Sequence, residues 1–563
     1  MEKDVVVVGS GGAGLTAAIV AALHGLDVLV IEKTEYFGGA TAMSGGGTWV
    51  PNSSLARQAG YTDSRAEAEK YVENVVGGAL RTDILQTYLD AAPAMLDFML
   101  ENTELDFWVA PFSPDYHPDV DGASNDGRLL SPAPYDGKRL KGYFDWLRPP
   151  LPEFNAPGGM MIDLPDMQHV LAPTSSLKSA IHVLKMVGRV AVDRLRGYKR
   201  GTRLTMGNAL AGRLLRSAID AGVTLWRNSP MTELVREGSR IVAVNVIREG
   251  KAKTIRVRRG VVLAAGGFSA SPEWRARHIP YADQHISLMP PGNTGDGLSA
   301  AIAVGGALDQ GNTQNAAWTV ISLYPRGDGT MGKWPHLFLD RPKPGFIIVN
   351  ANGERFGDEA SLNFVESMHR DGAVPAHLIC DARALRKYGL GAVLPGGWRL
   401  KRMLKTGYIK RAPTLDTLAA QIGIDAEGLK RTVARMNAFA ASGIDEDFGK
   451  GGNAFDRSIG DFSHTPNPCL GPIETAPFYA VQVSPGDATT TLGLRVDAQA
   501  RVLDAEEKPI PGLYACGLDM NSLWRGIPPA NGANNTLSLT FGFVAARHLA
   551  GINTPLVEKS EPA

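Results

Sequence analysis

Gly9-Ser-Gly-Gly-Ala-Gly14 has the spacing G-x-G-x-x-G and follows a short β-branched run. In this pattern the glycines permit a tight turn, close approach of a diphosphate and close packing of the next helix on the strand. Free N–H groups and the dipole at the start of that helix favour negative charge. Glu32, 18 residues after Gly14, stands where a carboxylate accepts hydrogen bonds from an adenosine ribose. The pattern predicts a dinucleotide site whose first part is lined by Gly9, Gly11, Gly12, Ala13, Gly14, Glu32 and Lys33.

A second run of small residues follows Glu32 and indicates which dinucleotide binds. A flavin ring is broader than a nicotinamide and needs a longer backbone cradle, so this run favours FAD over NAD. Two later runs that read as buried strands, 260–267 and 511–517, also end in glycine and would add walls to the same site. The additional residues expected at the cofactor are Gly38, Gly39, Thr41, Ser44, Gly45, Gly46, Ala265, Gly266, Gly267 and Gly517.

The elements that must position these glycines lie far apart in the chain. Strand signals occur at 5–8 and 26–32 on either side of a helical stretch at 15–24, and a hairpin is expected at 241–248 and 253–257. The helix expected at 537–549 follows the last glycine-ended strand. We therefore predict an α/β protein with a discontinuous, Rossmann-like FAD-binding domain of the glutathione reductase type.

An α+β substrate domain, which caps the cofactor domain, is expected between its two parts. It has its own strand signal at 346–349 and helical stretches at 415–422 and 426–441. A Pro/Gly/Asp-rich stretch, 111–159, is expected to form loops over the active site. The predicted division is 1–283 for the first part of the cofactor domain, with an insertion at about 111–204, then 284–483 for the substrate domain, 484–553 for the second part and 554–563 for a tail.

Composition narrows the class of protein further. The 563 residues carry 58 Lys and Arg against 58 Asp and Glu, so no global field points to nucleic acid. Three scattered cysteines predict neither a disulfide framework nor a metal site, and we expect a cytoplasmic protein. No apolar run reaches the roughly 18 residues of a spanning helix.

The motifs together resemble the fumarate reductase/3-ketosteroid dehydrogenase flavoprotein family. The resemblance rests on V-V-V-G-S-G-G-A-G, E-K-T-E-Y-F-G-G-A-T-A-M-S-G-G-G and L-A-A-G-G-F, and it continues through G-N-T-G-D-G (292–297), I-V-N-A-N-G-E-R-F-G-D-E (348–359) and P-G-L-Y-A-C-G (511–517). W-V-P-N (49–52) after the triple glycine is most similar to the ketosteroid dehydrogenase-like branch. Members that bind flavin covalently use a His in the glycine run; none lies between His24 and His117, so the resemblance implies noncovalent FAD.

The resemblance also implies the chemistry, which is hydride transfer between a substrate carbon and flavin N5 while a side chain moves a proton beside a polarised carbonyl. Pro114-Asp-Tyr116 resembles the P-D-Y that presents an active-site tyrosine, so Tyr116 is the expected proton carrier, and His117 beside it titrates near neutrality. The family's other catalytic tyrosines are replaced. Asn363 stands where the base is expected, and Pro528-Pro-Ala-Asn-Gly532 stands where Y-P-G-G-G holds the ketone, so that only Gly532 is kept.

Three functions remain open from the residues. The first is an FAD-dependent dehydrogenase, or reversed ene reductase, of a CH–CH bond beside a carbonyl in an apolar alicyclic or 3-ketosteroid-like substrate. The second is a fumarate reductase-like reductase of small unsaturated carboxylates, although the convergent Arg and His residues that a dicarboxylate needs are not evident. The third is a flavin-binding protein with a degenerate site, which Asn363 and Pro528 would permit. The sequence identifies no electron acceptor.

One segment is expected to lie outside this chemistry. Residues 176–200 carry seven Lys or Arg and one Asp, with apolar residues at helical spacing from Leu177 to Leu195. Such a basic amphipathic helix either lies on anionic lipid, making peripheral contact with the inner membrane face, or packs on the cofactor domain with a solvated basic rim. The sequence does not decide between lipid contact and packing on the cofactor domain.

Overall fold

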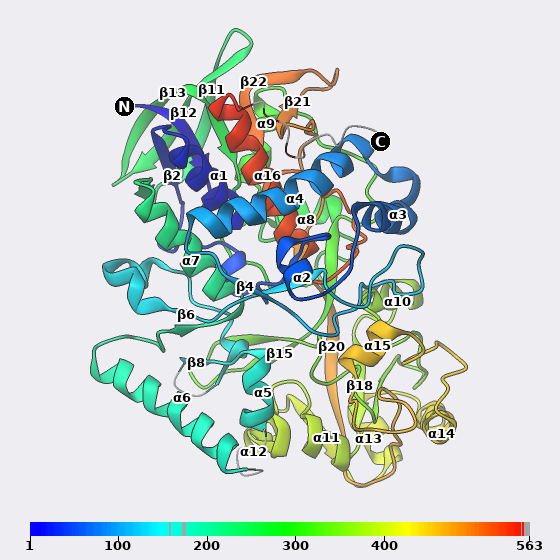
Figure 1. Cartoon of the computed structure of the whole chain (residues 1–563). Helices are drawn as coiled ribbons and strands as arrows, with labels where there is room; N and C mark the ends of the chain where they lie inside the picture. Colours follow the sequence, from blue (N-terminus) through cyan, green and yellow to red (C-terminus); the bar gives the residue numbers. More distant parts are fainter. Residues whose placement is uncertain (157–158, 172–175, 553, 555, 557–563) are drawn as a thin grey trace.

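The computed structural model describes residues 1–563 except 157–158, 172–175, 553, 555 and 557–563. Most of the expected tail, 554–563, therefore lies outside the described residues. Two β-sheets, each with its own helices, form the upper and lower parts of the molecule in Figure 1. Mixed α and β structure is thus present in both parts.

The first sheet is parallel at its centre. The order β10-β2-β1-β13 has Val6 of β1 paired with Leu29 of β2 on one side and Val261 of β13 on the other. All four residues of β2 are buried, as expected for a strand covered on both faces. The strands of this sheet are β1 Glu2–Val8, β2 Val28–Ile31, β10 Thr224–Trp226, β11 Met231–Glu237, β12 Arg240–Arg248, β13 Lys251–Leu263, β21 Arg501–Leu503 and β22 Pro509–Ala515.

Strand β13 differs from the sequence expectation. The runs 253–257 and 260–267 were expected as two strands, but one continuous strand passes from the hairpin with β12 into the parallel sheet. Its C-terminal half pairs with β22, which comes from nearly 250 residues later in the chain. A Cβ atom at Gly260 would lie 2.8 Å from the carbonyl oxygen of Gly512, so the glycine allows the two strands to approach. The middle and C-terminal segments therefore meet in this strand pair.

Helices cover the first sheet and bring the chain ends together. α1 (Gly12–Leu23) packs along α16 (Ala533–Ala550), and a Cβ at Gly542 would lie 2.5 Å from the Ala13 carbonyl oxygen. The other helices of this part are α2 Ser54–Gln58, α3 Arg65–Val76, α4 Thr82–Asn102, α7 Met206–Asp220, α8 Pro272–His278 and α9 Asp296–Ala303. The first and last regular elements of the chain thus share one core.

The second sheet has the order β16-β15-β20-β18-β17, and β14 and β19 also pair with β20. Its long central strand continues past the expected boundary at 483 and ends at Thr490. The strands are β14 Ile286–Ser287, β15 Ala316–Pro325, β16 Met331–Pro335, β17 Phe346–Val349, β18 Ala376–Cys380, β19 Ile409–Ala412 and β20 Phe478–Thr490. The helices are α10 Phe364–Asp371, α11 Ala382–Tyr388, α12 Leu400–Lys405, α13 Leu415–Ile422, α14 Ala426–Ser442 and α15 Ala454–Ile459.

The segment from 107 to 204 contains short strands and two helices rather than loops alone. In Figure 1, α6 (Leu177–Leu195) runs along the lower left edge of the molecule, and α5 (Leu164–Leu171) packs against it. The short strands of this segment are β4 Phe107–Val109, β5 Leu129–Pro132, β6 Tyr135–Asp136, β7 Asn155–Ala156, β8 Met160–Met161 and β9 Arg203–Leu204. Strand β3 (Thr48–Trp49) comes earlier in the chain and pairs with β5. Among the described residues, every helix is too short or too polar to cross a bilayer.

Candidate active site

The first glycine run forms a backbone cradle where β1 passes into α1. Gly9 has φ +104°, and a Cβ there would overlap the carbonyl oxygen of Ala264. A Cβ at Gly39 would lie 2.9 Å from the Cα of Gly11, so the second glycine run folds directly against the first. At Gly11 itself no protein atom lies within 4 Å of an added Cβ, so this position faces open space at the start of α1. That space suits an anionic group on the helix N-terminus.

Glu32 ends β2 and lies at the edge of this cradle. Its carboxylate accepts hydrogen bonds from the Ser10 hydroxyl (2.6 Å) and from the N–H and hydroxyl of Thr34 (both 2.8 Å). These donors hold the carboxylate in one orientation, as a ribose-binding acid requires. The neighbouring Lys33 crosses to another segment and pairs with Asp296 at 2.6 Å.

Thr41 and Ser44 stabilise the second glycine run. The Gly12 N–H donates to the Thr41 hydroxyl at 3.0 Å, which ties the run to the start of α1. The Ser44 hydroxyl donates to the Thr41 carbonyl at 2.9 Å and accepts from the Gly46 N–H at 3.0 Å. Side chains of small polar residues therefore shape this backbone by local hydrogen bonds.

Asp519 positions the end of β13, although nothing in the sequence singled it out. It is fully buried, and its carboxylate accepts hydrogen bonds from the backbone N–H groups of Ala265 (2.6 Å) and Gly267 (3.1 Å). Burial raises the pKa of Asp519 to about 6. The position of Asp519, two residues after Gly517, is the one sequence feature that could have pointed to it. That feature is weak, because an acid that follows a glycine-ended strand can have many roles.

A cleft lies between three chain segments: the N-terminal glycine runs with Glu32, the end of β13, and the turn at Gly517. Most of the residues expected at the cofactor line it. Of those, Gly9, Gly11, Gly12, Ala13, Glu32, Lys33, Gly39, Thr41, Ala265, Gly266 and Gly517 line it. The others, Gly14, Gly38, Ser44, Gly45, Gly46 and Gly267, lie in the same turns without lining this cleft. Lining residues that the sequence did not indicate include Arg148, Ser229, Met231, Asn293, Leu518 and Ser538. The open cradle at Gly11, the helix start and the oriented Glu32 fit the diphosphate and ribose of FAD.

The expected proton carrier lies beside the C-terminal loop. The Tyr116 N–H donates to the carbonyl of Pro529 at 2.9 Å, three residues before Gly532. The hydroxyl of Tyr71, on α3, donates to the same carbonyl at 2.6 Å and accepts from the His117 N–H at 3.2 Å. The ring of Tyr116 contacts Phe455 of α15 with centroids 5.0 Å apart. Tyr116 therefore lies where both parts of the molecule meet.

A buried ion pair fixes the loop that carries Tyr116. Asp115 accepts hydrogen bonds from Arg128 (2.7 Å) and from the indole N–H of Trp49 (2.8 Å), which follows the triple glycine. Arg128 also pairs with Asp63 at 2.8 Å, and all three charged side chains are at most 4% exposed. Burial raises the pKa of Asp115 to about 6 even though Arg128 acts to lower it. We call Asp63, Asp115, Arg128 and Trp49 the frame of the Tyr116 loop. The sequence did not predict the frame, because its members come from separate parts of the chain.

Gly532 lies at the start of α16 and against the triple glycine. A Cβ at this position would be 2.5 Å from the Gly47 carbonyl carbon, and the Asn535 amide donates to the Gly47 carbonyl oxygen at 2.9 Å. Within the described part of the chain, no acceptor is within hydrogen-bond range of the Gly532 N–H. A free N–H at the start of a helix is a preorganised donor for a developing negative charge.

Asn363 lies apart from this group in the described contacts. It precedes α10, where its N–H donates to the Ser361 hydroxyl (3.2 Å) and its carbonyl accepts from Glu366 (2.9 Å). Among the described residues, no hydrogen bond joins its amide to Tyr116 or Gly532. The structure thus brings together Tyr116 and the loop of Gly532, but not Asn363.

Burial sets the protonation of the two candidate proton carriers. Removal from water raises the pKa of the Tyr116 hydroxyl well above its ordinary value and lowers the pKa of the His117 imidazole. Both groups are therefore neutral near pH 7. Tyr116 is in the form that donates, and His117 is in the form that accepts.

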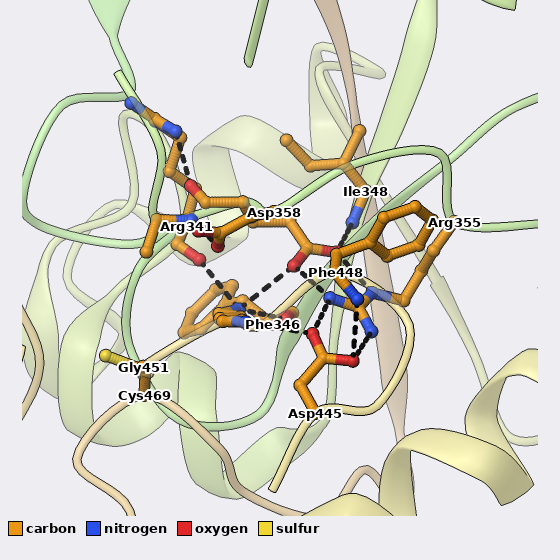
Figure 2. Close-up of polar contacts among 12 residues, drawn as sticks. Arg341, Phe346, Ile348, Arg355, Asp358, Asp445, Phe448, Gly451 and Cys469 are labelled. Atoms are coloured by element: carbon orange, nitrogen blue, oxygen red, sulfur yellow. Dashed lines mark hydrogen bonds and ion pairs between the residues drawn. The ribbon is translucent and has the colours of Figure 1, made fainter. Parts of the chain in front are cut away.

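Arg355 and Glu359 form a buried ion pair. Two hydrogen bonds of 2.8 Å join the side chains, and Arg355 also binds Asp445 at 2.8 Å. Figure 2 shows Arg355 beside Asp445. The Ile348 N–H also donates to the Glu359 carboxylate at 3.1 Å. All of these charged side chains are at most 4% exposed and bind one another, so they stabilise the second sheet and its loops rather than act on a substrate.

Several other candidates have structural partners. The Tyr324 hydroxyl donates to Glu153 at 2.9 Å, and the His369 imidazole lies 2.7 Å from that of His285. Met160 and Met161 are buried, and Trp318 packs against the cores of both parts. These contacts give the five side chains structural roles.

Comparison with known proteins gives the family. A family model described as "FAD binding domain" matches residues 4–534. The chain is 36% identical over 562 residues to 4-oxocyclohex-2-ene-1-carboxylate 5-dehydrogenase of Sinomonas cyclohexanicum, covering 97% of this chain and 93% of that protein. It is 35% identical to 3-oxosteroid 1-dehydrogenase of Mycobacterium tuberculosis, covering 98% of each.

A solved structure is similar over the same length. The 3-ketosteroid delta1-dehydrogenase from Sterolibacterium denitrificans, in complex with 1,4-androstadiene-3,17-dione, has a TM-score of 0.90 and 36% sequence identity, covering 98% of this chain and 99% of that one. The chain belongs to the FAD-binding family of flavoprotein dehydrogenases that includes these proteins. The expected family, flavoprotein fold, FAD cofactor and enzyme class, an FAD-dependent dehydrogenase, are confirmed.

Proposed function

We propose that the protein is an FAD-dependent dehydrogenase that acts on a CH–CH bond next to the ketone of an apolar alicyclic or 3-ketosteroid-like substrate. The observation that supports this proposal is the backbone hydrogen bond from Tyr116 to Pro529, which joins the loop of Tyr116 to the loop that leads to Gly532. The relatives support it, because they are named for oxidation of oxo-substituted rings. The reverse reaction, reduction of the conjugated ene, uses the same groups. The electron acceptor is left open.

In the proposed architecture, the first sheet and its helices form a Rossmann-like cofactor domain of the glutathione reductase type. Residues 1–283 and the segment after β20 compose it, and the second sheet forms the inserted capping domain. We place the second boundary after Thr490 rather than at 483, because β20 is hydrogen bonded throughout to strands of the second sheet.

The cofactor is held noncovalently in this proposal. The start of α1, from Gly9 to Gly14, binds the diphosphate, and Glu32 binds the adenosine ribose. The turn at Ala265 and Gly266, together with Gly517 at the start of the short 3-10 helix Gly517–Asp519, closes the remaining walls. From the second glycine run, Gly39 and Thr41 line the cleft, and we assign them to the flavin end. Bound FAD supplies the hydride acceptor for the reaction.

The chain's own groups handle the proton and the ketone. Tyr116 carries the proton at the carbon next to the ketone, and the Gly532 N–H donates a hydrogen bond to the ketone oxygen. Asn363 stands where the family places its base, but an amide has no titratable proton, so we assign it hydrogen bonding to substrate only. Stabilising the developing enolate is the larger of the two contributions.

Tyr116→Phe tests this assignment. We expect flavin reduction by a 3-ketosteroid or an oxocyclohexane in anaerobic stopped flow to slow by at least about tenfold, since one proton-transfer group is lost. FAD content should stay unchanged. Tyr143→Phe is the matched control, because it removes the hydroxyl of an exposed tyrosine that has no part in the proposed chemistry. An unchanged single-turnover rate in Tyr116→Phe would remove Tyr116 from the mechanism.

The same assay separates the competing functions. Bleaching of the flavin by a cyclic ketone supports the dehydrogenase. Reoxidation of reduced enzyme by fumarate alone would support a reductase of small unsaturated carboxylates, and no response to either would support a flavin protein with a degenerate site.

The proposal places the enzyme in the cytoplasm. Its three cysteines, Cys380, Cys469 and Cys516, are buried and free, as in proteins of reducing compartments. Peripheral contact with the inner membrane face through residues 176–200 belongs to the same proposal.

A further inference from the structure

Helix α6 presents its apolar residues to solvent rather than to the protein. The side that packs inward carries the buried residues Ser179, Met186 and Asp193. The apolar positions run along the other side, spaced by four and three residues. Exposed large side chains of this helix are Leu177 at 78%, Ile181 at 44%, Leu184 at 72%, Val187 at 50%, Val192 at 42% and Leu195 at 88%. We call the row of 177, 181, 184, 188, 191 and 195 the outer stripe.

The geometry of a helix places the outer stripe directly away from the molecule. With about 3.6 residues per turn, the stripe lies on the face roughly opposite Met186. Its length from Leu177 to Leu195 is about 27 Å at 1.5 Å per residue. The interpretation in which the apolar face packs on the cofactor domain is therefore wrong, because that face packs on nothing within the described residues.

The inward face is firmly attached to the rest of the chain. Asp193 accepts two hydrogen bonds of 2.8 Å from Thr202, and Arg189 pairs with Asp136 at 2.8 Å. His182 binds Asp166 of α5 at 2.8 Å. A helix held in place on one side and exposing a row of apolar side chains on the other offers a preformed docking surface. Single exposed leucines are common on protein surfaces and do not form such a surface.

Charge distinguishes between the possible occupants of this surface. Lys178, Lys185 and Arg196 are exposed along one flank of the outer stripe, while the helix's single acid, Asp193, is buried and bonded to Thr202. A second copy of the chain docked through the same face would bring like charges together. Anionic lipid complements both the positive flank and the apolar stripe.

We propose that α6 lies flat on an anionic lipid bilayer, with the outer stripe in the boundary between head groups and acyl chains. Leu177, Leu184 and Leu195 insert, and the basic flank contacts lipid phosphates. The docking to lipid is argued from the helix alone. Only its benefit to the enzyme rests on the proposed function: a lipophilic ketone substrate would be concentrated in the same bilayer.

Vesicle flotation of the holoenzyme tests the proposal. The vesicles are phosphatidylcholine with a third phosphatidylglycerol, and phosphatidylcholine alone serves for comparison. The stripe variant is Leu177→Ser with Leu184→Ser and Leu195→Ser. The matched control replaces three apolar residues exposed elsewhere, Leu323, Met331 and Ile444, with Ser. Wild type and control should float with anionic vesicles, and the bound fraction of the stripe variant should fall at least about tenfold.

A charge variant adds a second readout. Lys178→Gln with Lys185→Gln and Arg196→Gln should weaken flotation on anionic vesicles and leave weak binding to neutral ones unchanged. All variants should keep their FAD and their turnover of a water-soluble cyclic ketone, so that a failed substrate assignment leaves the flotation result valid.

Three outcomes would overturn the proposal. One is equal flotation of wild type and stripe variant. Another is absence of wild-type binding to anionic vesicles. The third is a wild-type dimer without lipid, seen by analytical ultracentrifugation, that the stripe variant converts to monomer, because the stripe would then be an interface between copies of the chain.

Discussion

The cleft that we assign to the cofactor and the proposed catalytic pocket around Tyr116 and Gly532 are built in different ways. In the cleft, backbone atoms meet at distances that exclude a side chain, as between Gly39 and Gly11, and the residue type follows from the space available. In the pocket, side chains on loops are held by buried polar contacts, as Asp115 and Arg128 hold the loop of Tyr116. A site formed by backbone atoms tolerates few amino-acid substitutions. A site formed by side chains can change its chemistry by substitution while the buried contacts that hold its loops stay the same.

The largest expected effect tests the backbone half of this comparison. Gly11→Val should leave the protein folded, because no protein atom lies within 4 Å of an added Cβ, yet it should abolish FAD binding by filling the cradle. The ratio of flavin to protein absorbance and the far-UV circular dichroism spectrum measure the two effects. Gly78→Val, at another glycine with open space around it, is the control. Retained FAD in Gly11→Val would show that the diphosphate lies elsewhere.

The second prediction concerns pH. Because the pKa of Tyr116 is raised by burial, the oxygen is protonated at neutral pH, and its proton-accepting form becomes more abundant as the pH rises. The dehydrogenation rate should therefore increase with pH by up to about tenfold per unit, and ene reduction should not. Stopped-flow rates from pH 6 to 10 in both directions would show this. A flat dehydrogenation profile in the wild type, or a rise with pH that persists in Tyr116→Phe, would contradict the assignment.

The third prediction concerns Tyr71, whose hydroxyl connects the Tyr116 loop to the loop before Gly532, and a smaller loss of turnover is expected here. Tyr71→Phe removes the hydroxyl shared by Pro529 and His117, so the loop of Tyr116 loses a tether and stability falls by about 1–3 kcal/mol. Turnover should drop about three- to tenfold with FAD retained. Tyr88→Phe removes an equally buried hydroxyl that donates to Trp49, and serves as control. Equal losses of turnover in the two variants would mean that general destabilisation, not loop position, is responsible.

The glycine turns were predictable from the sequence because each needs a glycine and keeps its spacing within one turn. The parallel strands followed from β-branched runs such as Val5 to Val8. Asp519 and Arg128 could not be predicted, because their roles depend on partners 254 and 13 residues away and on burial that no local pattern reveals. The direction of the outer stripe was equally hidden, since an amphipathic pattern gives the apolar face of a helix but not what covers it.

The smallest expected effect lies away from both sites. Burial and the neighbouring Asp456 raise the pKa of Asp358 to about 8, whereas the unfolded chain would lose that proton near pH 4. The stability that depends on this proton is present below about pH 4 and is lost as the pH rises through about 8. Asp358→Asn should therefore have a larger free energy of unfolding than wild type at pH 8, by at least about 1 kcal/mol, and the difference should narrow as the pH falls towards 4. Asp119→Asn, at an exposed carboxyl, is the control, and parallel melting curves at all pH values would refute the assignment.

The cleft that takes the cofactor has a consequence for biosynthesis. Its walls include Val8 and Ser538, and α1 packs along α16, the last helix of the chain. While the ribosome is still translating the middle of the message, the nascent N-terminal strands have neither the wall at Gly517 nor the helix at Ala533. The complete cleft exists only after α16 has left the ribosome, so we expect flavin loading to follow the synthesis of this helix, and truncation before Ala533 to yield an apoprotein.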